Sequence, residues 1–393
     1  MPFWLDIAAT IDKDESFLKR RNCAMTNLAF DFHLPTRILF GRGRIAELGA
    51  QVPPGIDRIF LVTDGTIARK TPALDKAVKA LPGKEIAVFD RVEENPSIAT
   101  LEEAARKAKA FDAGLVIGLG GGSPMDVAKG VGLLAANPGP LMFYLEGGTP
   151  AHPSLPVVAI PTTSGTGSEV TPFAVFTDRD IRQKMCLSHR GIFPVLALID
   201  PELTYTMPTS VAIDTGLDVL AHAVEAFLST ASFPLNDALA RQAMDIVLAD
   251  LAGAVRKQPE AMDRMAASST AAGAAIAQAS TILPHLMGYP LTVHRGVPHG
   301  RASAIMLVHV MAALRRRSTC PEKVEAVDQL FAARGGLDEF LRDLGVSTRL
   351  ADYGVREDDI PLFARKTIVK GDVKITPAAV TVEDLERIYR EAL

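Results

Sequence analysis

The hydrophobic positions in the first half of the chain fall into short runs of four to seven residues, separated by stretches with helical spacing. Runs this short between amphipathic helices are typical of strands buried on both faces, and therefore of a largely parallel sheet. The segment TRILFG (36–41) is expected near an edge of that sheet. The strands are predicted over 58–63, 86–89, 114–120, 157–161 and 196–200.

The strand pattern disappears from about residue 208, and long stretches rich in alanine and leucine follow. We predict an α/β domain over 26–207 and an all-helical domain over 208–393, joined at MPTSV (207–211). Residues 1–25 are expected to form a disordered leader. A cleft between two such domains is the usual place for a site. The helical stretches are 215–229, 234–256, 262–281 and 321–344.

Composition limits the classes of function. The chain has 393 residues, of which 48% are hydrophobic and 22% charged, as expected of a two-domain globular protein. A net charge of −4 and a pI near 6.1 argue against binding to nucleic acid or to anionic membranes. Neither a signal-peptide core nor a long apolar run is found, and Cys23, Cys186 and Cys320 form no close pair. We therefore expect a cytoplasmic protein without disulfides.

A glycine loop joins a predicted strand to a predicted helix in GLVIGLGGGSPMDVAKG (114–130). The backbone amides of Gly120, Gly121 and Gly122 can face a pyrophosphate, and the helix N-terminus adds its partial positive charge. Ser123 is expected to cap the helix, and Asp126 to hold further amides or a ribose hydroxyl. A plain strand-to-helix turn is the alternative, but three consecutive glycines followed by Ser-Pro favour a phosphate or dinucleotide site.

Two further segments extend this predicted cofactor site. The polar turn PTTSGTGSEVT (161–171) also follows a strand, and its Thr162, Thr163 and Thr166 hydroxyls can line the same cleft. Asp64 ends the strand LVTD, where a carboxylate can accept hydrogen bonds from both ribose hydroxyls and would repel a 2′-phosphate. The sequence therefore favours NAD over NADP.

A metal site is indicated by one helix and one histidine-rich segment. Asp218 and His222 lie four residues apart on one face of the predicted helix GLDVLAHAVEAF (216–227), which is otherwise apolar. A buried aspartate there needs a partner, although a solvated polar stripe is the alternative. His285 and His299, from HLMGYPLTVHRGVPHG, can complete a set of one carboxylate and three imidazoles. Such oxygen and nitrogen donors suit Fe(II) or Zn(II).

These motifs together resemble the iron-containing (group III) alcohol dehydrogenases. The resemblance covers the chain from LPTRILFGRGRIAELG (34–49) onward and includes GGGSPMDVAK, PTTSGTGSEVT, DVLAHAVEAF and PHG. It implies a dinucleotide-binding α/β domain with a parallel sheet and an all-α metal-binding domain, a fold shared with dehydroquinate synthase. The metal ligands that it implies are Asp218, His222, His285 and His299. The cofactor contacts that it implies are Asp64, Asn95, Gly121, Gly122, Ser123, Thr162, Thr163, Thr166, Val175 and Lys184.

The sequence departs from the family at Tyr289. Many members carry a histidine four residues after the third metal ligand, and it is thought to help shuttle the proton. Tyrosine can donate or relay a proton, but an ordinary pKa of about 10 makes it a poorer base than histidine. Tyr289 is therefore the catalytic candidate, and His294 is not expected to bind the metal.

The resemblance implies reversible hydride transfer between NAD(H) and a short primary alcohol or aldehyde, with Fe(II) or Zn(II) as a Lewis acid. Two rivals stay open: a lyase of the dehydroquinate-synthase type, and an NAD-binding sensor without activity. A homodimer or a higher homo-oligomer is expected by analogy with the family.

Two basic pairs raise the question of the substrate. His294 and Arg295 lie between two predicted ligands, and His189 and Arg190 precede the last predicted strand. If one arginine lines the cleft, it would favour an aldehyde that carries an anionic group. If the arginines are only solvated, the enzyme is a generalist alkanol dehydrogenase.

Overall fold

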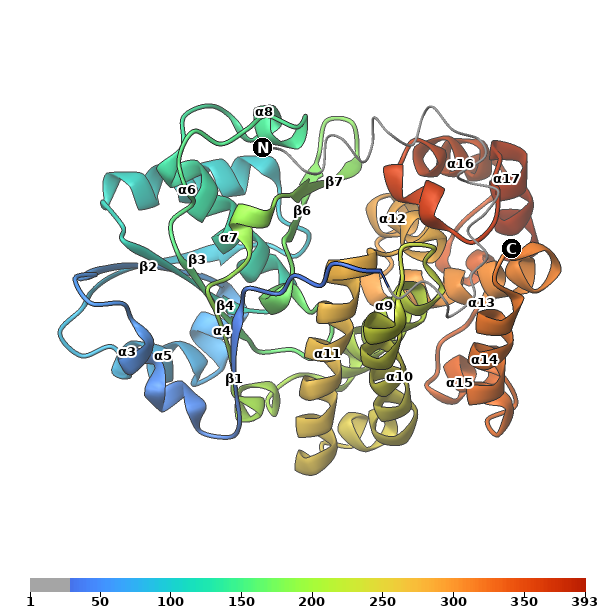
Figure 1. Ribbon diagram of the computed structural model, residues 1–393, viewed down its shortest axis with the longest axis horizontal. Coiled ribbons are helices and arrows are strands. Elements are labelled where there is room, and N and C mark those ends of the chain that lie inside the picture. Colours follow the sequence, from blue (N-terminus) through green and yellow to red (C-terminus); the bar gives the residue numbers. More distant parts are fainter. Residues whose placement is uncertain (1–28) are drawn as a thin grey trace.

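The computed structural model describes residues 29–393 and consists of an α/β half and a helical half that lie side by side (Figure 1). Six parallel strands form the main sheet, in the order β1-β8-β5-β4-β2-β3. All the predicted strands are confirmed, and β1, from the TRILFG segment, forms an edge as expected. The strands are β1, Arg37–Phe40; β2, Arg58–Asp64; β3, Glu85–Val92; β4, Leu115–Gly120; β5, Val157–Pro161; and β8, Leu196–Ile199.

Helices cover both faces of this sheet, which explains why the central strands are continuous apolar runs. Leu101 and Val131, from α6 and α7, pack with Phe60 on one face, whereas Leu48 and Ala77, from α3 and α5, belong to the core on the other face. The helices of this half are α3, Leu48–Gln51; α4, Gly65–Lys70; α5, Ala73–Lys79; α6, Ile98–Ala110; α7, Gly122–Ala136; and α8, Leu141–Leu145.

An antiparallel hairpin, which was not predicted, crosses from the sheet toward the helical half (Figure 1). Its strands are β6 (Phe173–Asp178) and β7 (Gln183–Ser188). Each has only a few fully buried positions, so neither produces the continuous apolar run that reveals the buried parallel strands. Lys366, from α16 (Ile360–Ile368), donates to the carbonyl oxygen of Ile181 at the hairpin turn, over 2.8 Å.

The helical half contains no strand among the described residues after Ile199. The stretch predicted over 321–344 is two helices, because Gly335 and Gly336 adopt positive φ angles of 76° and 102° between them. Among residues 29–393, none of the helices is long and apolar enough to span a membrane. The helices are α9, Thr209–Leu228; α10, Pro234–Val255; α11, Pro259–Ala279; α12, Leu283–Arg295; α13, His299–Arg317; α14, Pro321–Ala332; α15, Leu337–Asp343; α16; and α17, Val382–Glu391.

Short 3₁₀ helices occupy several connections in both halves. They are η1, Arg44–Glu47; η2, Ser168–Val170; η3, Arg190–Ile192; η4, Pro201–Thr204; η5, Leu350–Tyr353; η6, Glu357–Asp359; and η7, Gly371–Ile375. The predicted leader, 1–25, lies outside the described residues. Cys186 is a free thiol.

The two halves meet at two glycines. A Cβ atom on Gly273, in α11, would lie 2.7 Å from the Cα atom of Gly167, which belongs to the loop after β5. Next to this crossing, the Thr270 hydroxyl donates to the Glu169 carboxylate over 3.0 Å. Only glycine allows the loop and the helix to approach so closely.

We expect Gly273→Ala to lower the midpoint of urea unfolding, with a loss of about 1–3 kcal/mol from overpacking. In an open helix the same change would stabilise the protein by about 1 kcal/mol, so the sign of the effect is diagnostic. Gly371→Ala is the matched control, because a Cβ there would meet no atom within 4 Å. A Gly273→Ala variant at least as stable as the parent would contradict the close contact.

Candidate functional site

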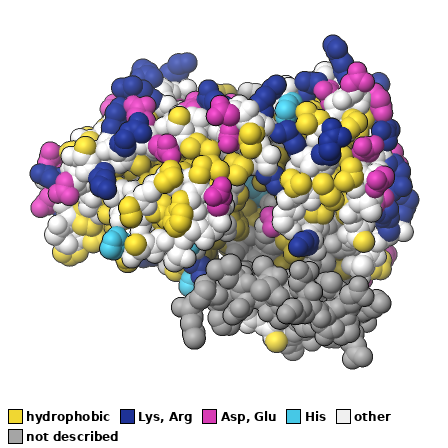
Figure 2. Space-filling model, turned by 90° about the horizontal axis from the view of Figure 1, so that it is seen from above, with side chains coloured by type: hydrophobic (Ala, Val, Ile, Leu, Met, Phe, Trp, Pro, Cys, Tyr) yellow, Lys and Arg dark blue, Asp and Glu magenta, His cyan; other side chains and the backbone are white. Residues whose placement is uncertain are grey.

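A cleft of about 3440 Å³ runs between the two halves, and the hollow is visible from above in Figure 2. It is lined by the residues that the sequence singled out for catalysis, cofactor binding or metal binding, except Gly120. Those residues are Asp64, Asn95, Gly121, Gly122, Ser123, Asp126, Thr162, Thr163, Thr166, Val175, Lys184, Asp218, His222, His285, Tyr289 and His299.

The α/β side of the cleft is built at the carboxyl ends of three neighbouring strands. Strands β2, β4 and β5 are adjacent and parallel, so the segments that follow Asp64, Gly120 and Pro161 meet at one edge of the sheet. Helix α7 begins at Gly122, with Gly121 as its N-cap and no side chain capping it. The expected cap by Ser123 is therefore wrong, and the first amides of α7 are left available to an anion.

The glycine loop and the threonine turn are in contact. A Cβ atom on Gly122 would lie 2.7 Å from the Thr166 methyl carbon, and one on Gly121 would lie 3.4 Å from the Thr163 hydroxyl oxygen. The Thr162 hydroxyl is buried and has no hydrogen-bond partner among the described residues. The two loops thus form one polar wall with hydroxyl groups and backbone amides.

A buried ion pair supports this wall from behind. Asp126 accepts hydrogen bonds from the Ser168 hydroxyl (2.6 Å) and from the backbone N–H of Val175 (2.9 Å), so it holds an amide as predicted. Lys129 lies 3.3 Å from Asp126 and donates to the carbonyl oxygens of Ser168 (2.9 Å) and Phe173. Burial lowers the pKa of Lys129. Lys129 was not predicted as part of the site, although a charge amid the apolar positions of a helix was a signal.

Asp64 uses one of its two carboxylate oxygens within the protein. Its Oδ1 accepts from the backbone N–H groups of Thr66 (2.8 Å) and Ile67 (3.0 Å) and so caps α4. Its Oδ2 is directed toward Gly120, where an added Cβ would lie 3.4 Å away. One carboxylate oxygen therefore remains for a ligand.

Lys184, on β7, brings a positive charge to the middle of the cleft. Its ammonium group donates to Asn95 Oδ1 over 2.6 Å and lies 5.9 Å from the centre of the Tyr289 ring. Burial lowers its pKa to about 8. Asn95 has a positive φ of 54°, so the backbone of that turn is held in a conformation that few residues adopt.

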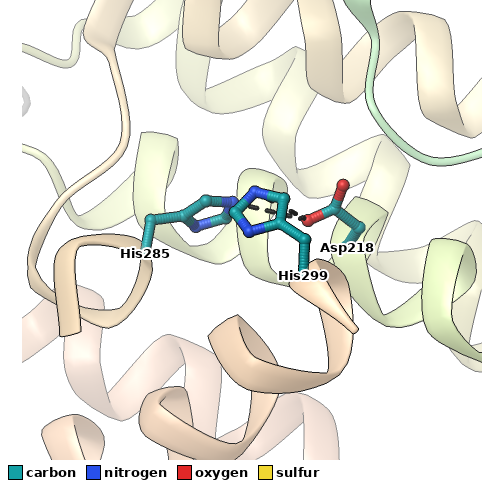
Figure 3. A group of neighbouring side chains, drawn as sticks. All are labelled: Asp218, His285 and His299. Atoms are coloured by element: carbon teal, nitrogen blue, oxygen red, sulfur yellow. Dashed lines mark ion pairs between the residues drawn. The ribbon is translucent and has the colours of Figure 1, made fainter. Parts of the chain in front are cut away.

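The helical side of the cleft carries the predicted metal ligands on three helices (Figure 3). Asp218 lies on α9, His285 on α12, and His299 is the first residue of α13. The three donor atoms lie within 4.8 Å of one another, and Asp218 Oδ1 is 3.4 Å from His285 Nε2. Asp218 and His285 are almost fully buried.

His222 lies beside this group but not at its centre. Its Nε2 is 4.0 Å from Asp218 Oδ1, and its ring stacks on that of His285 with centroids 4.6 Å apart. Its Nδ1 faces the carbonyl oxygen of Gly165, 3.3 Å away, in the threonine turn. The imidazole therefore presents Nε2 toward the carboxylate.

The electrostatics of the group show how strongly its members depend on one another. Burial by itself would raise the pKa of Asp218, but the surrounding imidazoles hold it well below its usual value. Burial also opposes protonation of His285, yet Glu225 and Asp218 raise its pKa to about 9. Burial lowers the pKa of His222 to about 4, and burial together with Lys184 keeps that of His299 far below normal.

The donor atoms fit a divalent cation. Asp218 Oδ1 and His285 Nε2 are buried atoms without any hydrogen-bond partner among the described residues. Leaving such groups unpaired costs about 1–3 kcal/mol each, which a bound cation would recover. One carboxylate with imidazole nitrogens is a donor set for Fe(II) or Zn(II).

Local packing explains how the histidine-rich segment reaches the site. It is helical rather than a surface loop, with Gly296 at a φ of 68° ending α12 before α13 starts. A Cβ on Gly300 would lie 2.1 Å from the carbonyl oxygen of Asp214, so only glycine lets α13 begin against α9. Pro290 has no N–H to donate to the carbonyl oxygen of Leu286, which lies 3.4 Å from the Thr367 hydroxyl.

Tyr289 lies between His299, one of the predicted metal ligands, and Lys184 of the hairpin. Its ring stacks on His299 with centroids 5.6 Å apart, and its hydroxyl makes no hydrogen bond with any described residue. Burial raises its pKa well above 10. The phenol therefore keeps its proton at neutral pH and can act as a donor but not as a base.

The two basic pairs, His294–Arg295 and His189–Arg190, do not converge on the predicted metal ligands. Arg295 is bound to Asp359 and does not line the cleft, and His294 packs against Phe363. Arg190 lines the cleft and lies 3.4 Å from Asp31. His189 also lines the cleft and caps η3. Of the two arginines considered for an anionic substrate, Arg190 lines the cleft and Arg295 does not.

Comparison with known proteins agrees with this geometry. Lactaldehyde reductase of Escherichia coli is 33% identical over 375 residues, which cover 90% of this chain and 97% of the relative. Sulfoacetaldehyde reductase of Bilophila wadsworthia is 32% identical over 360 residues, covering 86% and 92%. A solved iron-containing alcohol dehydrogenase of Thermotoga maritima superposes with a TM-score of 0.84 at 37% identity, covering 93% and 99%.

Two family models together span most of the chain. Residues 35–201 match the model of iron-containing alcohol dehydrogenase, and residues 212–393 match the C-terminal model of the Fe-containing alcohol dehydrogenase family. The unmatched residues between them include the start of α9, close to the predicted junction. The chain therefore belongs to the iron-containing alcohol dehydrogenase family.

Proposed function

We propose that this protein transfers a hydride reversibly between NAD(H) and a short primary alcohol or aldehyde, with Fe(II) or Zn(II) as its metal. The observation that carries the proposal is one cleft that combines a wall of backbone amides and threonine hydroxyls with a group of one carboxylate and three imidazoles. Asp218, His222, His285 and His299 would hold the ion. When bound, it would polarise the substrate oxygen as a Lewis acid.

The cofactor would lie along the carboxyl edge of the sheet. The amides of Gly121, Gly122 and Ser123 and the nearby threonine hydroxyls would receive the pyrophosphate. The unused oxygen of Asp64 would accept from the adenosine ribose, and its charge disfavours a 2′-phosphate. The other contacts that the resemblance implies, Asn95, Val175 and Lys184, line the same cleft and support a nicotinamide end near the metal group.

The chain's own groups would orient the substrate and hold its proton. Tyr289 keeps its phenol protonated, and its ring stacks on that of His299. Lys184, with a pKa of about 8, carries a second exchangeable proton in the same part of the cleft. Aldehyde reduction needs a proton as well as a hydride, and these two groups could supply it.

For the substrate we propose an uncharged short aldehyde rather than an anionic one. Arg295, one of the two arginines considered for an anion, is bound to Asp359 away from the cleft. Arg190 lies at the cleft but has an acidic neighbour in Asp31. Relatives are named for both kinds of substrate, lactaldehyde and sulfoacetaldehyde.

We also propose a homodimer or higher homo-oligomer. Among the described residues, strand β1 is an edge of the sheet, and its residues Ile38 and Phe40 are 41% and 37% exposed. An open strand edge with apolar side chains is a place where a second copy can add.

Replacing His285 or His299 by alanine should remove the metal and abolish turnover, because an ion that loses one of four ligands is bound much more weakly. Metal content after dialysis, measured by atomic emission, checks this. NADH binding should be kept in both variants. His294→Ala is the control and should retain its metal; full metal content in both ligand variants would overturn the assignment.

NADH should be the better cofactor by kcat/KM. Asp64→Ser should raise the ratio of NADPH to NADH efficiency by about tenfold, which corresponds to roughly 1.4 kcal/mol. Serine keeps an oxygen that can cap α4, so the change tests charge rather than folding. A parent enzyme that prefers NADPH would show that the placement of Asp64 is wrong.

A panel of aldehydes tests the reaction itself. NADH oxidation by the iron- or zinc-loaded protein should be faster with propanal, lactaldehyde and 3-hydroxypropanal than with sulfoacetaldehyde or succinic semialdehyde. Arg190→Ala should leave the ranking unchanged. Preference for the anionic aldehydes, lost in Arg190→Ala, would instead make Arg190 the anion site. A metal-loaded protein that binds NADH but turns over no aldehyde would indicate a sensor.

A further inference from the structure

Helix α9 presents a third polar residue on the face that carries the metal ligands. Glu225 follows Asp218 by seven residues and His222 by three, so all three lie along one side of the helix. Its side chain is fully buried. A carboxylate removed from water in this way must have partners, because an unpaired buried charge is very costly.

Both oxygens of Glu225 are in use. Oε1 lies 2.5 Å from Nδ1 of His285, and Oε2 accepts from the backbone N–H groups of Ile282 (2.8 Å) and His285 (3.3 Å). Ile282 is the N-cap of α12 and His285 lies in its first turn, where the backbone N–H groups have no partner within the helix. One carboxylate therefore anchors both the start of α12 and the ring of its histidine.

The contact with Nδ1 determines which nitrogen of His285 is available. When Nδ1–H donates to the carboxylate, Nε2 carries the free lone pair, and Nε2 is the atom that lies 3.4 Å from Asp218. The three imidazoles differ in this respect. His222 Nδ1 faces a backbone carbonyl, and His299 Nδ1 has no partner among the described residues. Of the three histidines, His285 is the one whose Nδ1 contacts a carboxylate, that of Glu225.

We propose that Glu225 is a positioning residue of the metal site, which fixes the tautomer and orientation of His285 so that Nε2 faces the ion. The inference rests on the proposed ligand set and adds to it a residue that would not touch the metal. It also explains why a carboxylate, with two acceptor atoms, stands at this position. An amide has one acceptor and one donor end, and here both ends meet N–H groups.

Glu225→Gln is the informative substitution, because it keeps the size of the side chain. We expect the affinity for Zn(II), measured by competition with a chelator, to fall by about 10- to 100-fold. With Co(II) in place of Zn(II), the visible absorption bands should shift, since the geometry of one ligand changes. Affinity within twofold of the parent and an unchanged cobalt spectrum would overturn the proposal.

Asp250→Asn is the matched control for the loss of a buried carboxylate. Asp250 lies on α10, away from the cleft, and forms two hydrogen bonds with Arg264, of 2.7 and 2.6 Å. This change should lower the thermal stability of the protein but leave the Zn(II) affinity within twofold. An equal loss of affinity in both variants would make the role of Glu225 merely structural.

Two further measurements separate the possible failures. In the zinc-loaded parent, ¹⁵N spectra should show His285 protonated at Nδ1 and bound through Nε2, a readout that needs no variant to fold. The opposite tautomer would refute the role of Glu225. If His299→Ala loses zinc while Glu225→Gln keeps it, only this inference fails. If His299→Ala also keeps zinc, the ligand set itself is wrong, and the role of Glu225 with it.

Discussion

The helical side of the cleft depends on the carboxylate of Asp218, which is buried in apolar surroundings that disfavour a charge. Asp218 lies in the middle of an apolar helix and is 3% exposed. It can stay ionised there only because imidazole groups from two other helices and from its own helix surround it. That requirement brings α12 and α13 against α9. It also explains the glycine after His299, because any larger residue at position 300 would collide with α9.

A second constraint, the order of the strands, builds the other side of the cleft. Because β2, β4 and β5 are neighbours, three loops that are far apart in the sequence end at one edge. The buried pair Lys129–Asp126 then fixes the threonine turn and the hairpin on α7, through the hydroxyl of Ser168 and the N–H of Val175. The polar wall is thus supported by groups that need not touch a cofactor.

The difference between what the sequence predicted and what it missed follows from the range of the interactions. Strands buried on both faces leave continuous apolar runs, and Asp218 and His222 leave a spacing of four on an apolar helix; both are local patterns. The hairpin strands β6 and β7 are only partly buried and leave no such run. Glu225 stood within the quoted motif DVLAHAVEAF, but its partner His285 is sixty positions away, so no local spacing joins them. The same holds for Arg295, whose partner Asp359 removes it from the cleft.

The threonine turn belongs to both sides of the cleft, and this limits how independently the two can vary. Thr162, Thr163 and Thr166 face the proposed cofactor site, while the carbonyl of Gly165, between them, faces Nδ1 of His222. The turn cannot move away from α9 without losing that contact. Only glycine fits at this approach to α9, since a Cβ at Gly165 would lie 2.5 Å from the Cβ atom of Thr215. The backbone that would receive the cofactor in the proposed function therefore also contacts His222, a proposed metal ligand, so one short segment would link the two proposed sites.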